Sequence, residues 1–173
     1  MLVAAVMTGG REMKTLIISH NVFGGTNNLC KTLLSYFADF QPEEIAQFYI
    51  HSEVPTDDSV CVNYYRFTDR DALRSLVPGR TRGRQFRRDE IQTGRVQSRT
   101  DSGVTGAAYR LGRKRTAAVF AARNALWKLA RWDTKQLRRW VVDVDPDVIF
   151  SRRWITASPM ISPWRQPIRR ASP

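Results

Sequence analysis

The chain has few of the residues that cross-link a small protein or bind metals, with only two cysteines and two histidines among 173 residues. Cys30 and Cys61 are too few and too isolated to form a disulfide framework or a zinc site. We therefore expect both to be small core residues of a cytoplasmic protein without a bound metal or a resident cofactor. The sequence also lacks any run near the roughly 20 apolar residues that cross a membrane, which leaves only peripheral membrane contact open.

Acidic residues are outnumbered by basic ones, 16 to 28, and the net charge of +12 is unevenly distributed. Residues 80–115 carry +8 and residues 151–173 carry +5, whereas residues 1–79 carry −3. Because residues 78–114 show no apolar periodicity, we predict a basic loop insert there. The insert either binds phosphate, nucleic acid or lipid head groups, or is a solvated segment, and its few aromatic residues disfavour nucleic acid. The candidate anion-binding patch consists of Arg80, Arg82, Arg84, Arg87 and Arg88.

A strand, a glycine-bearing loop and a helix follow one another directly between Lys14 and Phe37. The run from Leu16 to Ile18 is typical of a parallel strand that is covered on both faces. The two glycines allow a tight turn and a close approach to a ligand, and the N-terminus of the next helix suits a phosphate or a carboxylate. The predicted ligand loop is Gly24, Gly25, Thr26, Asn27 and Asn28, and the predicted buried helix face is Leu29, Leu33, Tyr36 and Phe37.

Further strands and helices alternate along the chain and predict an α/β fold. We expect strands at 45–50, 59–67 and 148–150 and helices at 68–76, 115–131 and 134–142. The expected core face of the first of the last two helices is Ala118, Ala122, Ala125 and Leu129, with Phe120 and Trp127 nearby as core aromatics. The expected core face of the second is Leu137, Trp140 and Val141. His20 and His51 each come at the carboxyl end of a predicted strand, where ligands collect in open α/β sheets, so both are possible ligand contacts.

The pattern over Lys14 to Phe150 resembles the N-terminal domain of a GT-B glycosyltransferase of the family commonly called family four. The resemblance rests on the first strand with its GGTNNLCKTLLSYF loop and helix, on the helical middle region and on the late DPDVIF strand. It implies a partial Rossmann-like parallel sheet with flanking helices and the transfer of a sugar from a nucleotide-sugar donor to an acceptor. It also implies that the loop at Gly24 and Gly25 passes close to the donor diphosphate, where backbone N–H groups can stabilise leaving-group charge.

Both ends of the chain depart from this pattern. Residues 1–13 are predicted to be an N-terminal extension, with Met13 as the natural start, because MKTLIIS begins the first strand directly. Residues 151–173 form an irregular basic tail with four prolines and no acidic residue. Shifting the frame by one nucleotide allows Ser151 to Trp164 to be decoded as FAAVDYSFPYDIAV, so we expect a frameshift after Phe150 and a truncated enzyme. Such a fragment lacks the donor-binding domain and is expected to be inactive alone.

Overall fold

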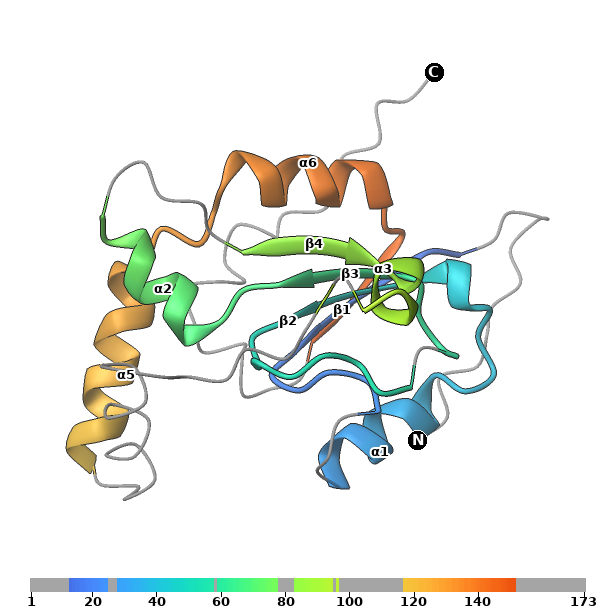
Figure 1. Cartoon of the computed structure of the whole chain (residues 1–173), viewed down its shortest axis with the longest axis horizontal. Coiled ribbons are helices and arrows are strands. Elements are labelled where there is room, and N and C mark those ends of the chain that lie inside the picture. The colour runs from blue at the N-terminus through green and yellow to red at the C-terminus, as the bar shows by residue number, and fades with distance from the viewer. Residues whose placement is uncertain are drawn as a thin grey trace.

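The computed structural model describes residues 13–24, 28–57, 59–77, 83–94, 96 and 117–151. Five strands form one sheet in the order β4-β3-β2-β1-β5 (Figure 1). Their bounds are β1 Thr15–Ser19, β2 Ile45–Tyr49, β3 Asn63–Arg66, β4 Arg84–Arg87 and β5 Val148–Ser151. Strands β1, β2, β3 and β5 run parallel, and β4 runs antiparallel to β3.

The strand order explains why the fold is a partial Rossmann-like sheet. The chain moves outward from β1 to β2 and β3, and later returns to the other side of β1 as β5. The order of the parallel strands therefore reverses between β1 and β5, which is the topological switch point of such folds. Backbone hydrogen bonds from Asp147 and Val148 to the Lys14 carbonyl hold the start of β5 against β1. The predicted α/β fold class is confirmed.

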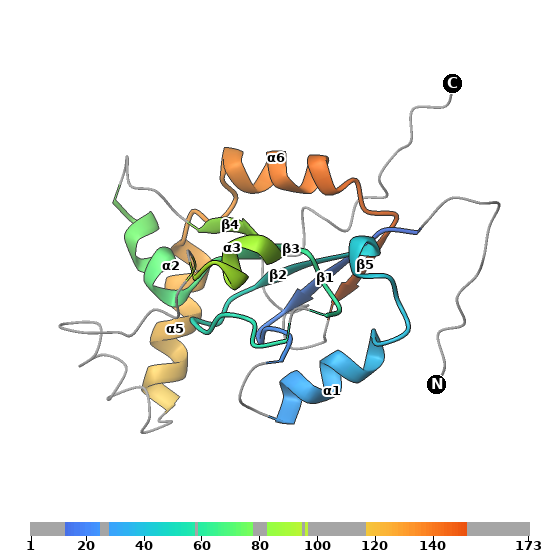
Figure 2. The same ribbon diagram turned by 45° about the vertical axis from the view of Figure 1, so that its right-hand side comes forward.

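Helices cover both faces of the sheet, with α1 and α6 on opposite sides (Figures 1 and 2). The helix bounds are α1 Asn28–Tyr36, α2 Asp69–Ser75, α3 Arg88–Gln92, α5 Ala117–Leu129 and α6 Lys135–Val144, and a 3-10 turn spans Pro42–Glu44. Alternate strand residues point to opposite faces, so Leu16 and Ile18 pack under α6 whereas Ile17 packs toward α1. Thr134 caps the N-terminus of α6, because its hydroxyl accepts from the Leu137 N–H at 3.1 Å.

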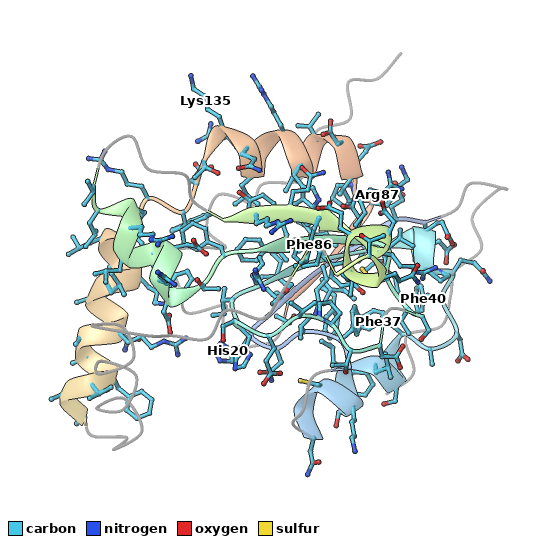
Figure 3. All side chains as sticks on the ribbon, in the orientation of Figure 1. His20, Phe37, Phe40, Phe86, Arg87 and Lys135 are labelled. Carbon is cyan, nitrogen blue, oxygen red and sulfur yellow. The ribbon has the colours of Figure 1, made fainter. Side chains whose placement is uncertain are left out.

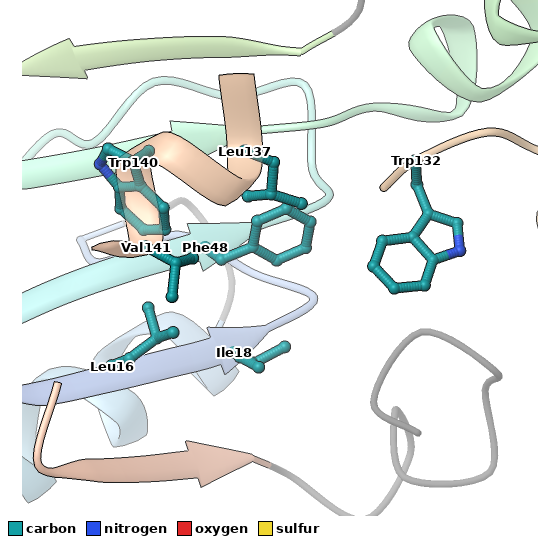
Figure 4. A pocket seen from close by; sticks show the side chains of 7 residues that line it. All are labelled: Leu16, Ile18, Phe48, Trp132, Leu137, Trp140 and Val141. Atoms are coloured by element: carbon teal, nitrogen blue, oxygen red, sulfur yellow. The ribbon is translucent and has the colours of Figure 1, made fainter. Parts of the chain in front are cut away.

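A small apolar cavity lies between α6 and the sheet (Figure 4). Its volume of about 20 Å³ is close to that of one water molecule, and it is lined by apolar and aromatic side chains. Such a space suits neither a phosphate nor a sugar, so we regard it as a packing gap of the core. The lining residues are Leu16, Ile18, Phe48, Trp132, Leu137, Trp140 and Val141.

The structure corrects several sequence expectations. Part of the predicted loop insert at 78–114 is regular, because β4 and α3 occupy residues 84–92. Strand β4 carries a single inward side chain, Phe86, which is fully buried and stacks on Tyr64 with ring centroids 5.4 Å apart. One apolar residue gives no periodicity, which is why the pattern indicated a loop. The third strand is also shorter than predicted, covering 63–66 rather than 59–67.

Two predicted helix faces are partly wrong. In α5 the expected core residues Ala118, Ala122, Ala125 and Leu129 are exposed, and so is Phe120, whereas Trp127 is buried as expected and packs the helix against the rest of the protein. The large indole buries more apolar area than the alanines do, so it decides the orientation of the helix. Leu33 in α1 and Phe37 directly after the helix are buried as predicted, but Tyr36 is 58% exposed. The inward face predicted for α6 is confirmed.

Candidate functional site

The carboxyl ends of the parallel strands bring polar residues together at one edge of the sheet. His20 follows β1, His51 follows β2, and Asp69 begins α2 after β3. The two imidazole rings meet edge to face, with centroids 5.8 Å apart. The sequence therefore predicted the position of both histidines correctly, at the edge where open α/β sheets bind ligands. We refer to the loops at residues 20–24 and 51–57 as the carboxyl-edge loops.

Gly24 occupies a position in the first carboxyl-edge loop that only glycine fits. Its φ of +64° is left-handed, and a Cβ there would lie 2.4 Å from both Cβ and backbone N of Asp57. The Thr56 hydroxyl donates to the Gly24 carbonyl and joins the two loops. The close approach expected of this glycine is thus made to the second loop of the protein itself.

The remaining residues of the predicted ligand loop are only partly described. Asn28 is exposed and is the first residue of α1, and its carbonyl accepts from the Thr32 hydroxyl at 3.1 Å. Gly25, Thr26 and Asn27 lie outside the described residues.

Gln47 holds the first loop from inside the sheet. Its side chain is fully buried on β2, and its Oε1 accepts from the Phe23 N–H at 3.3 Å. Its Nε2 donates to the Ser19 hydroxyl at 2.9 Å and to the Asn21 carbonyl at 3.0 Å. Sequence reasoning missed this residue, although an amide inside the apolar run IAQFYI is a signal for a buried polar contact.

Buried side chains also hold the second loop. The Tyr49 hydroxyl donates to the Glu53 carbonyl at 3.0 Å, and the Arg66 guanidinium donates to the Ser52 carbonyl at 3.2 Å. Arg66 is only 2% exposed, and its guanidinium carbon lies 5.8 Å from the centre of the Phe86 ring. His51 accepts at Nδ1 from the Glu53 N–H at 3.4 Å. The loops are therefore tied to β2 and β3 rather than only to each other.

The electrostatic surroundings keep His20 uncharged. Burial, the Arg123 guanidinium and His51 lower the pKa of His20 to about 4, against a smaller opposing effect of Asp69. Asp69 accepts from Arg123 Nε at 3.1 Å and from the Trp127 indole N–H at 2.6 Å, which docks α5 beside the carboxyl edge (Figure 1). At neutral pH the imidazole of His20 thus carries one donor and one acceptor nitrogen, which suits hydroxyl groups.

The described arginines of the predicted basic patch lie on β4 and α3. Figure 3 shows His20 and Arg87 at opposite ends of the sheet, since β4 runs antiparallel to its neighbour. Arg84 forms an ion pair with Glu90 at 3.3 Å, and Arg88 donates to the Ser59 carbonyl at 3.4 Å. Arg80 and Arg82 lie outside the described residues.

Neither cysteine is placed for chemistry. Cys30 and Cys61 are both buried, as predicted, and burial raises the pKa of the Cys61 thiol to about 12. In the part of the chain that the structure describes, no group of three or more His, Cys, Asp or Glu residues could hold a metal ion. No helix among the described residues is long and apolar enough to span a membrane.

Comparison of the chain with protein-family models, curated proteins and solved structures found no match.

Proposed function

We propose that the chain is the acceptor-side part of a GT-B glycosyltransferase that moves a sugar from a nucleotide-sugar donor to an acceptor. The observation that carries the proposal is a left-handed glycine and two adjacent histidines at the carboxyl edge of a Rossmann-ordered sheet, beside its switch point. In this scheme the carboxyl-edge loops form one wall of the cleft in which transfer occurs, and a second α/β domain supplies the donor site.

The residues of this wall have complementary tasks in the proposal. The loop from Gly24 to Asn28 leads into α1, whose N-terminal N–H groups favour the negative charge that develops on the departing diphosphate. His20 contacts sugar hydroxyls, because its neutral imidazole both donates and accepts hydrogen bonds, and His51 is a second contact beside it. The donor domain is required for transfer, so the chain alone is expected to be inactive.

The coding DNA provides the first test. We propose that residues 151–173 are read out of frame, so the nucleotides beyond the codon of Phe150 should contain a shifted open frame that encodes a second α/β domain. A downstream region without such a frame would refute this part of the proposal.

The second test is the activity of a frame-restored protein, in which the chain continues into the proposed second domain. Restoring the frame and supplying UDP-, GDP-, ADP- and dTDP-sugars with a panel of saccharide and lipid acceptors should give acceptor-dependent release of a nucleoside diphosphate. The 173-residue chain without the second domain is the matched control and should release no nucleoside diphosphate. A frame-restored, folded protein that releases no nucleoside diphosphate with any of these donors would argue against glycosyl transfer.

A further inference from the structure

Gln47 is a polar side chain in the centre of an apolar layer. It lies between Ile45 and Tyr49 on the face of β2 that packs toward α1, and it is fully buried. Burying a carboxamide is unfavourable unless each of its polar atoms finds a partner. The side chain must therefore offset this cost with hydrogen bonds made inside the protein.

All of the Gln47 side-chain hydrogen bonds go to one short segment. The Phe23 N–H, the Ser19 hydroxyl and the Asn21 carbonyl lie at 3.3, 2.9 and 3.0 Å from the amide atoms that contact them. Together they use the carbonyl oxygen and both N–H donors of the carboxamide. The segment they fix ends at Gly24, whose left-handed backbone abuts Asp57.

We infer that Gln47 is the positioning residue of the carboxyl-edge site, holding the backbone from Ser19 to Gly24 in a preformed arrangement. Its role in sugar transfer rests on the proposed function, whereas its effect on the loop does not. A hydrogen-bonded side chain fixed on a central strand sets loop geometry more rigidly than contacts between loops do. The first carboxyl-edge loop is thus a rigid wall of the site.

Amide hydrogen exchange of the 173-residue chain tests this inference directly. In Gln47→Leu the Phe23 amide loses its acceptor, so its exchange should be at least about tenfold faster, with smaller increases at its neighbours in the loop. The Phe67 amide donates to the Tyr49 carbonyl at 3.0 Å on the same edge of the sheet. Its exchange rate should change only by the amount that any loss of global stability in the variant requires. Gln85→Leu is the matched control, because Gln85 is an exposed glutamine on β4.

Two results would overturn the inference. One is unchanged Phe23 exchange in Gln47→Leu, and the other is equal acceleration of every sheet amide, which indicates a merely structural residue. If Gln47→Leu does not fold, Ser19→Ala removes one partner of Gln47, together with the bond that the Ser19 hydroxyl itself donates to the Asn21 carbonyl at 2.7 Å, and should still accelerate exchange at Phe23, by about threefold. No acceleration there would also refute the inference. Because no ligand is added, the hydrogen-exchange result is independent of whether the frame-restored protein transfers sugar.

Discussion

Replacing Gly24 by alanine should destabilise the fold far more than the same change at Gly94. Both glycines are left-handed, with φ of +64° and +68°. The backbone penalty for alanine is therefore similar at the two positions, about 1 kcal/mol. At Gly94 no atom of the described residues, apart from its chain neighbours, lies within 4 Å of the added Cβ, so Gly94→Ala should cost only that penalty.

The additional loss of folding stability in Gly24→Ala comes from overlap with the second carboxyl-edge loop. The new Cβ would sit 2.4 Å from two atoms of Asp57, one of them backbone, where carbon contacts are normally about 3.5–4.0 Å. No rotamer change relieves this overlap, so the two loops must separate, at about 1–3 kcal/mol. Urea unfolding should thus give Gly24→Ala a loss of about 2–4 kcal/mol and Gly94→Ala a loss of about 1 kcal/mol. Equal losses would refute the close packing of the carboxyl-edge loops.

Three further perturbations follow from the described contacts. Asp69→Ala removes the acceptor of Arg123 and Trp127 and should cost about 1–2 kcal/mol by thermal unfolding, with a change in Trp fluorescence. Asp133→Ala removes the partner of the exposed Arg138 and should leave the unfolding temperature nearly unchanged. The folded pKa of His20, about 4, lies below its ordinary 6.5, so the unfolded chain binds the proton first and stability should fall by about 2 kcal/mol as the pH drops from 6.5 to 4. A His20→Gln variant with the same pH profile as the parent would contradict that assignment. Both cysteines are buried and the Cys61 pKa is about 12, so neither should react with a thiol reagent at pH 8 until denaturant is added; rapid labelling of the folded chain would be inconsistent with this core.

The elements that the sequence predicted well are those with a long apolar signal. The continuous run in β1 and the strong one-sided pattern of α6 specify their buried faces without any tertiary information. Strand β4 has no such signal, because its one buried residue, Phe86, is recognisable only once Tyr64 lies beside it. The orientation of α5 likewise depends on where Asp69 stands to receive Trp127.

The candidate site likewise contains some residues that the sequence predicts and others that only the structure identifies. His20 and His51 could be predicted, because chain position after a strand determines the edge of the sheet on which a residue lies. The residues that contact Gly24 and Gln47 could not be predicted. Residues 56–57 contact Gly24 and residues 19–23 contact Gln47 only because the parallel pairing of β1 and β2 brings them together. Arg87 lies away from the histidines because β4 runs antiparallel to β3, and this strand direction could not be predicted from the sequence.

We propose that the carboxyl edge of the sheet, and not Arg87 and Arg88 at its other end, carries the function. The most direct test compares nucleoside diphosphate release by the frame-restored protein in two variants. His20→Ala with His51→Ala should reduce acceptor-dependent release at least about tenfold, while Arg87→Ala with Arg88→Ala should leave it nearly unchanged. Full activity in the histidine variant together with loss in the arginine variant would contradict the account.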